Sequence, residues 1–500
     1  MVRRIVIVAV AAILAAACGP AGPTMPTEFA PAESTAPLPT TSPTTAITAP
    51  SAAVADDPAD IADLLGVGDS LYPGLGNGGY DVDHYTIDLT FDPEPHALNA
   101  EVQIEATATT PIQDFSLDFA GFDIAMITID KQEVDFTRDG KELIVSSPEV
   151  IPIGQAFVTT VAYSGTPTPV QSQALPFHVG WLTDSSGVSY VIGEPDGGHT
   201  WMPMNDHPSD KATYTFRITV PDPLIAAANG VHVETITDLG WATWVWESEQ
   251  PMASYLATVI VGDLDIVADP ESTVVSGVPV RNVLPDDLSS ASLDTLAKHG
   301  EMISYFETVF GPYPFDAYGL AVVEDFEAAL ENQTLSIFGR YMVDIPQFFE
   351  IVMVHELAHQ WFGNSVTPSD WGDIWLNEGF ATYAEWLWIE HTAGNAAMLS
   401  QVEAERNRMA ISALPPPGSP PADDLFNSSV YIRGGLVLHA LRVEVGDEAF
   451  FNIVRQYADT YRHGVVVADD FITIAESVAE QDLGNLFDEW LYGEEVPELP

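Results

Sequence analysis

The sequence contains a single cysteine among its 500 residues, so the chain cannot form an internal disulfide bond. Basic residues are also few, because 16 Lys and Arg stand against 73 Asp and Glu, which gives a formal net charge of −57. A surface this acidic repels polyanions, which excludes nucleic acid as a partner, and anionic lipid headgroups would not attract it either. The fold must therefore be held by its apolar core, with or without a bound metal.

Apolar residues are plentiful by contrast, at 46% of the chain, while charged residues make up 18%. This composition is typical of globular proteins rather than of disordered or fibrous ones. At roughly 150 residues per domain, the length accommodates two or three domains that each bury a core. The acidic excess indicates a solvated acidic surface more than a specific basic partner.

The N-terminus has the pattern of a targeting segment. Arg3 and Arg4 precede an apolar run over 5–17, which is too short for a transmembrane helix, and Cys18 follows. Residues 1–18 resemble a bacterial lipoprotein signal, in which the cysteine is acylated and becomes the mature N-terminus. Ala15 departs from that pattern, which usually has leucine there, and an ordinary secretory signal with an incidental cysteine is the alternative. We expect a secreted protein, held by a lipid anchor alone on the outer face of a bacterial cytoplasmic membrane.

Beyond residue 18 the chain falls into three segments that differ in composition and hydrophobic pattern. Residues 19–66 are rich in Pro, Thr, Ser and Ala and predict a disordered tether. From 67 to 269, short runs of β-branched and aromatic residues are separated by Gly, Pro, Asp and Asn, which predicts a β-rich domain. From 270 to 500 the spacing is mainly helical, with helices expected over 288–310, 349–362 and 376–391.

The helix expected over 349–362 contains a pattern typical of metal sites. His355 and His359 are four residues apart, so both imidazoles leave the same face of the helix and can bind one Zn²⁺. Glu356 lies beside them, where it can take a proton from a water molecule activated by the metal. The alternative is a surface helix with two unrelated histidines.

A catalytic zinc site needs a third protein ligand, and the next helix offers one. Glu378 follows His359 by 19 residues, near the start of the helix expected over 376–391. Three protein ligands would leave the fourth position open, the arrangement of catalytic zinc. Glu385 lies two turns along the same face, either as a partner of a ligand histidine or as a solvated acid.

These motifs resemble the zinc signature of the aminopeptidase N family of gluzincin metallopeptidases (peptidase family M1), which also contains leukotriene-A hydrolase. HELAHQWFGN and WLNEGF carry the signature, and HTWMPMNDHPSDKATYTF, AANG, QPMASYLA and GPYPFDAYGL follow the family in the same order. The resemblance implies an α+β multidomain protein with one zinc ion per chain. An N-terminal antiparallel, saddle-like β-sheet domain would precede a thermolysin-like, mainly helical catalytic domain. It also implies a short form that lacks the family's C-terminal helical domain, with a more open cleft.

The resemblance also implies how the substrate is held. Ala328–Ala329–Leu330–Glu331–Asn332 stands where the family has Gly-Ala-Met-Glu-Asn, so Glu331 would bind the substrate's free α-amino group, with Ala329 and Asn332 as further substrate-binding residues. Glu194 falls on a second amine-binding acid, while Ile192 replaces the glutamine that accompanies it. Tyr431 falls on the family's catalytic tyrosine, whose phenol stabilises the oxyanion, and Arg433 replaces a lysine.

The expected function is therefore that of a zinc-dependent aminopeptidase, with His355, His359 and Glu378 as metal ligands and Glu356 and Tyr431 as catalytic residues. Its partners would be peptides with a free N-terminus. A zinc endopeptidase with the same site remains possible if Glu331 does not anchor an amine. An epoxide hydrolase and a non-catalytic binding lipoprotein are less favoured by these residues, and the sequence does not indicate the oligomeric state.

Overall fold

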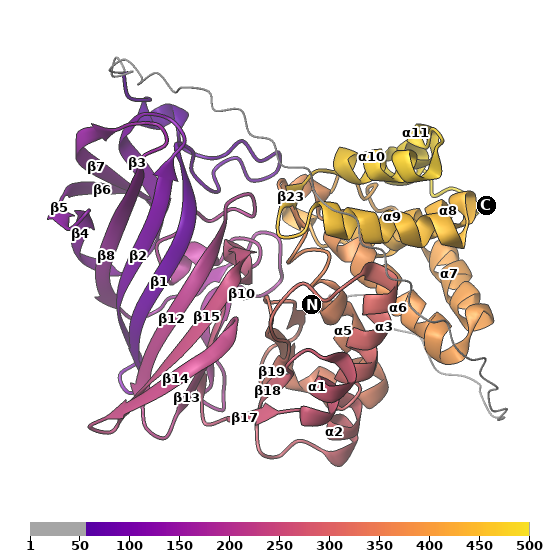
Figure 1. Ribbon diagram of the computed structural model, residues 1–500, viewed down its shortest axis with the longest axis horizontal. Coiled ribbons are helices and arrows are strands. Elements are labelled where there is room, and N and C mark those ends of the chain that lie inside the picture. The colour runs from indigo at the N-terminus through magenta and orange to yellow at the C-terminus, as the bar shows by residue number, and fades with distance from the viewer. Residues whose placement is uncertain (1–56, 500) are drawn as a thin grey trace, which may run out of the picture.

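The computed structural model describes residues 57–499, which form a strand-rich N-terminal part and a helix-rich C-terminal part (Figure 1). This arrangement confirms the fold class that the sequence predicted. The predicted signal segment over 1–18, with Cys18, and most of the predicted tether lie outside the described residues. Within the described range, no helix has both the length and the apolar content that a bilayer crossing requires.

The largest sheet of the N-terminal part has eight strands in the order β14-β15-β12-β1-β2-β8-β4-β5. Its neighbours pair antiparallel except β1 and β12, which run parallel, so the expected antiparallel sheet is in fact mixed at this one pair. Buried and exposed side chains alternate along β1 and β2, because one face of the sheet packs on the core. The strands are β1 (Tyr80–Asp92), β2 (Ala97–Ala108), β4 (Asp123–Ile129), β5 (Gln132–Glu133), β8 (Ala156–Gly165), β12 (Lys211–Pro221), β14 (Val231–Asp238) and β15 (Trp241–Ala253).

Two smaller antiparallel sheets complete the N-terminal part. One has the order β3-β7-β6, and the other has the order β13-β16-β11-β10-β9. The chain next to β13 reaches the C-terminal part, where the side-chain amide of Asn229 donates to Gln333 O at 2.8 Å. The strands are β3 (Ile112–Asp118), β6 (Asp135–Asp139), β7 (Glu142–Ile151), β9 (Val170–Gln171), β10 (His178–Thr183), β11 (Ser189–Ile192), β13 (Ile225–Ala228) and β16 (Val259–Gly262).

The C-terminal part, called the catalytic part in the sequence-based prediction, contains a five-stranded sheet that the sequence did not predict, in the order β17-β18-β19-β21-β20. β17 (Asp265–Ala268) lies before the boundary expected at 269/270, yet it pairs with β18 (Arg281–Leu284) of this sheet. The C-terminal part therefore begins a few residues before the predicted boundary. The other strands are β19 (Leu320–Val323), β20 (Ala329–Leu330) and β21 (Ser336–Gly339), and β19 lies parallel to both β18 and β21.

The helices follow the expected pattern with two corrections. The helix expected over 288–310 is two helices, α2 (Ser290–Leu296) and α3 (His299–Phe310), because Lys298 N–H donates to Thr295 O three residues back and the tighter turn interrupts the α-helix. The helix expected over 349–362 is α5 (Pro346–Ala358), which starts at a proline and ends one residue before His359, its C-cap. The others are α1 (Pro270–Ser276), α4 (Arg340–Val343), α6 (Trp375–Ala393), α7 (Asn395–Ala410), α8 (Gly434–Val445), α9 (Asp447–Thr460), α10 (Ala468–Ala479) and α11 (Gly484–Phe487).

The described chain begins inside the segment that composition placed in the tether. Residues 57–66 include a short 3₁₀ helix, Ile61–Asp63, and the backbone N–H of Ala59 donates to Pro111 O at 2.9 Å. Leu64 is only 6% exposed, so this stretch packs on the β-rich part. The folded part therefore extends further toward the N-terminus than the boundary at 66/67.

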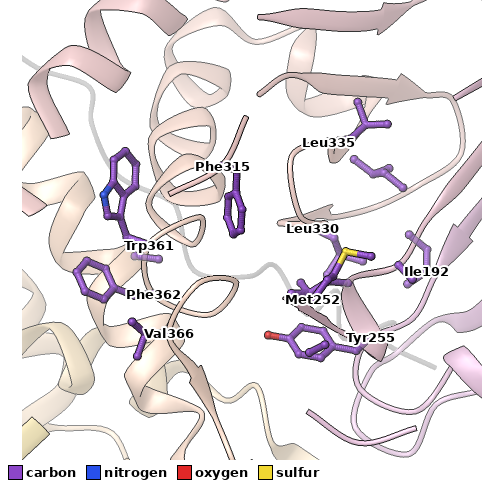
Figure 2. Close-up of a cluster of buried hydrophobic side chains, with 14 of the residues drawn as sticks. Ile192, Met252, Tyr255, Phe315, Leu330, Leu335, Trp361, Phe362 and Val366 are labelled. Carbon is purple, nitrogen blue, oxygen red and sulfur yellow. The ribbon is translucent and has the colours of Figure 1, made fainter. Parts of the chain in front are cut away.

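An apolar cluster lies where the two parts meet (Figure 2). Ile192, Met252 and Tyr255 come from the N-terminal part, and Leu330 and Leu335 come from the C-terminal part. All five side chains are buried. Burial of several such side chains stabilises an interface by about 1.5–3 kcal/mol each relative to exposure. This contact fixes the strand β20 and the residues that follow it against the N-terminal part.

Candidate metal centre and active site

Two histidines project together from the end of α5. Because the backbone N–H of His359 still donates to His355 O at 3.3 Å, the two residues are held one helical turn apart. Their ring centroids lie 4.8 Å apart, and His355 and His359 are 9% and 1% exposed. The structure therefore confirms that the four-residue spacing places both imidazoles on one face of the helix.

The first turn of α6 brings a carboxylate to the same point. Nε2 of His355 lies 3.1 Å from Oε2 of Glu378, and Nε2 of His359 lies 3.5 Å from the same oxygen. The three possible ligand atoms all lie within 4.8 Å of one another, which suits a single metal ion. Burial alone would raise the pKa of Glu378, but the two histidines outweigh it and lower the pKa to about 2, so the ligand is a carboxylate.

The outward-facing nitrogens of both histidines already have partners. Nδ1 of His355 lies 2.7 Å from Oε1 of Glu385, and Nδ1 of His359 lies 3.1 Å from Phe362 O. An Nδ1 proton donated to each oxygen leaves the lone pair on Nε2, toward Glu378, as metal-binding histidines require. The donor set therefore fits zinc, and Glu385 is the hydrogen-bond partner of a ligand histidine rather than a solvated acid.

Glu356 points into the same site from α5. A carboxylate oxygen of Glu356 lies within 4.8 Å of ligand-type atoms of Glu331 and His359, and the residue is 5% exposed. Burial raises the pKa of Glu356 to about 8, with Glu331 and Glu378 adding to the effect and the histidines opposing it. A carboxylate with a pKa near neutrality is suited to accept and return a proton.

Two further buried carboxylates lie close enough to the histidines and Glu378 to interact with them electrostatically. Glu331 follows β20 and Glu194 follows β11, so each comes from a different part of the fold. Burial raises the pKa of both, and the charges of Glu331 and Glu378 raise that of Glu194 further. The Oε1 atom of each is buried without a hydrogen-bond partner among residues 57–499. Such a pair favours a cationic group between them.

The remaining predicted substrate-binding residues lie next to Glu331. Ala329 is half-buried in β20, opposite Phe338 of β21. Asn332 donates from Nδ2 to Leu256 O at 3.1 Å, while its Oδ1 is buried without a partner in the described part of the chain. Asn332 therefore ties the segment after β20 to the N-terminal part.

Tyr431 lies over His355. It belongs to a single π-helical turn, Ser429–Arg433, and its ring lies 5.9 Å from the His355 ring at an interplanar angle of 19°. Burial raises the pKa of Tyr431 well above its usual value, and Glu378 and Glu194 raise it further. The phenol is therefore protonated at neutral pH and can donate a hydrogen bond.

The position of Tyr431 is set by contact between two glycines. Gly379 follows the ligand Glu378, and Gly434 follows Arg433 at the start of α8. A Cβ on Gly379 would lie 2.8 Å from Gly434 C, and a Cβ on Gly434 would lie 2.9 Å from Gly379 Cα. The backbones of α6 and the Tyr431 segment therefore touch, and only glycine allows this approach.

Sequence reasoning assigned no role to two residues that hold Glu331 in place. Nε2 of Gln360 and Nδ2 of Asn364 both donate to the backbone oxygen of Glu331, at 2.9 and 2.7 Å. Both lie in HELAHQWFGN, but polar residues after a metal-binding pair give no local signal of a bond to a distant backbone oxygen.

Two ligand histidines and a ligand carboxylate around one point, with a buried glutamate beside them, place the protein in the class of zinc metallopeptidases. The Peptidase family M1 domain model matches residues 295–490, and the Peptidase M1 N-terminal domain model matches residues 81–256. The chain belongs to peptidase family M1.

Solved structures and curated proteins agree with this assignment. An M1 zinc metallopeptidase from Deinococcus radiodurans superposes with a TM-score of 0.81 at 32% identity, covering 87% of this chain and 98% of that one. A mutant of it bound to a Tyr-Ser-Ala substrate gives the same score and identity. Leucine aminopeptidase 2 of Yarrowia lipolytica is 26% identical over 77% of this chain, and aminopeptidase M1-A of Oryza sativa subsp. japonica is 25% identical over 81%. This chain spans 62% and 49% of the length of those two relatives.

Proposed function

We propose that this protein is a zinc-dependent aminopeptidase that removes the N-terminal residue from peptides with a free N-terminus. The observation that carries the proposal is the pair of buried carboxylates, Glu331 and Glu194, whose Oε1 atoms find no partner among the described residues. An ammonium group is the ligand that would satisfy both. The aminopeptidase names of the relatives and the tripeptide bound to the Deinococcus radiodurans mutant support the same function.

Each residue of the site has a separate role in the proposed reaction. His355, His359 and Glu378 would hold zinc, which polarises the scissile carbonyl and lowers the pKa of the attacking water. Glu356 takes the proton of that water and returns it to the leaving amine. Tyr431 donates its phenolic proton to the developing oxyanion. Glu331, with Glu194, binds the α-ammonium and so sets the scissile bond one residue from the N-terminus.

The test compares one peptide with a free N-terminus and the same peptide N-acetylated, each with and without a metal chelator. We expect chelator-sensitive cleavage of the free peptide only, because acetylation removes the charge that Glu331 binds. The variant Glu331→Gln should lose at least tenfold in kcat/KM on the free peptide, since a hydrogen bond to a charged group contributes roughly 1.5–3 kcal/mol. Comparable cleavage of both peptides by the unchanged protein would instead identify an endopeptidase, and cleavage of neither would leave the aminopeptidase proposal without support.

We further propose that the protein is a secreted lipoprotein anchored through Cys18. The support is the sequence of residues 1–18, with its charged start, short apolar run and terminal cysteine. A clickable fatty acid fed to producing cells should label the protein, and the variant Cys18→Ser should carry no label. An unlabelled protein with Cys18 intact would contradict the anchor and favour an ordinary secretory signal.

A further inference from the structure

A lysine from the N-terminal part donates hydrogen bonds to the turn that lies beyond the metal-binding helix. Lys211 is the first residue of β12, and its ammonium donates to Asn364 O, Ser365 O and Thr367 Oγ1, each at 2.9 Å. These three acceptors belong to the turn over residues 362–367, which residues 359–361 separate from α5. A fourth, longer hydrogen bond runs to Gly464 O at 3.5 Å. The lysine therefore connects the N-terminal part mainly to this turn.

The turn over 362–367 carries groups that hold the active site. Phe362 O lies 3.1 Å from Nδ1 of the ligand His359, and the side chain of Asn364 donates to Glu331 O at 2.7 Å. Within the turn, Thr367 Oγ1 donates to Gly363 O at 2.7 Å, and Asn364 N–H donates to His359 O at 2.9 Å. A shift of the turn would consequently move a metal ligand and the proposed amine anchor together.

The ammonium has an unusual environment for so acidic a protein. No carboxylate lies within 4.0 Å of Lys211 in the part of the chain that the structure describes, and its acceptors are neutral oxygens. Burial lowers the pKa of Lys211 to about 7.

We propose that Lys211 is a positioning residue for the active site, which acts through the turn over 362–367 on His359 and on Glu331. The part of this proposal that concerns Glu331 rests on the proposed aminopeptidase function, whereas the part that concerns His359 does not. Loss of the ammonium should weaken both zinc binding and the selection of a free N-terminus.

The test uses Lys211→Met, with Lys141→Met as the matched control. Lys141 is a partly buried lysine of the N-terminal part, and its ion-pair partners among residues 57–499 are Asp118 and Glu142, both in the N-terminal part. Each variant loses one ammonium, so the control measures what such a loss does away from the turn over 362–367. All measurements are made on the full chain, well below the lower of the two melting temperatures.

The first readout is the zinc dissociation constant, measured by competition with a chromophoric chelator. Lys211→Met should bind zinc about tenfold more weakly than Lys141→Met, since groups that orient a ligand histidine typically contribute 10–100-fold to metal affinity. This readout needs no peptidase activity, so it decides the His359 part even if the aminopeptidase proposal fails. Equal zinc affinity of the two variants would overturn that part.

The second readout is kcat/KM on the free peptide at saturating zinc, so that weaker zinc binding does not contribute to it. This value should fall at least tenfold in Lys211→Met and stay within threefold of the unchanged protein in Lys141→Met. An unchanged value in both variants would overturn the Glu331 part. If Lys211→Met does not fold, Thr367→Val removes one acceptor of the ammonium at nearly constant volume, and it should shift both readouts in the same directions by a smaller factor. No shift in Thr367→Val would then overturn the proposal.

Discussion

Glu356→Gln should lower kcat by about 10³-fold while leaving zinc content and the melting temperature close to those of the unchanged protein. Glutamine keeps the shape of the side chain but cannot accept the water proton, and general acid–base catalysis typically contributes 10²–10⁴-fold. Since Glu356 is not one of the three groups that converge at the metal position, the metal should stay bound. Steady-state kinetics measures the fall in kcat, and zinc determination on the same sample checks that the metal is still bound.

The matched control for that variant lies on the same helix. Glu350 of α5 accepts from Lys298 at 2.6 Å and from the indole of Trp388 at 3.0 Å, away from the histidines. Glu350→Gln removes the same charge, so it should change kcat less than threefold even if it lowers stability. Turnover by Glu356→Gln at the level of this control would exclude Glu356 as the base.

Tyr431→Phe should lower kcat by 10²–10³-fold with little change in KM. An oxyanion donor acts mainly in the transition state, and removal of one such donor typically costs this much. The hydroxyl of Tyr431 has no hydrogen bond to another group among residues 57–499, so its loss should not disturb the fold. Initial rates over a range of substrate concentrations separate kcat from KM.

A second tyrosine provides a control that distinguishes loss of catalysis from loss of stability. The hydroxyl of Tyr305, on α3, donates to Leu387 O at 3.0 Å and lies outside the group of site residues. Tyr305→Phe should therefore lower stability by about 1 kcal/mol and leave kcat unchanged. A Tyr431→Phe protein that behaved like Tyr305→Phe would remove Tyr431 from the mechanism.

The metal-binding residues were predictable because their spacing is local. His355 and His359 lie one turn apart on a helix that the apolar pattern already indicated, and Glu378 lies at the start of the next helix. The roles of Glu331, Glu194 and Tyr431 were implied by resemblance alone, because no local periodicity connects residues so far apart. The structure nevertheless gathers all three around the two histidines.

The five-stranded sheet of the catalytic part shows why other features were not predictable. β19 and β21 are only four residues long and buried on both faces, so they lack the alternation that identifies a strand. Lys211, Gln360 and Asn364 were missed for a related reason, since each bonds to backbone or hydroxyl oxygens distant in the sequence. A side chain that recognises a remote carbonyl leaves no pattern in its own neighbourhood.

The contact between Gly379 and Gly434 has a consequence for redesign of the enzyme. Because the two backbones touch, a side chain larger than glycine at either position would push apart the segments that carry Glu378 and Tyr431. A library that varied only one of these glycines would mostly sample proteins in which the two helices are pushed apart. Libraries that aim to change substrate preference should therefore leave Gly379 and Gly434 unchanged, so that the separation of the ligand and the phenol is kept.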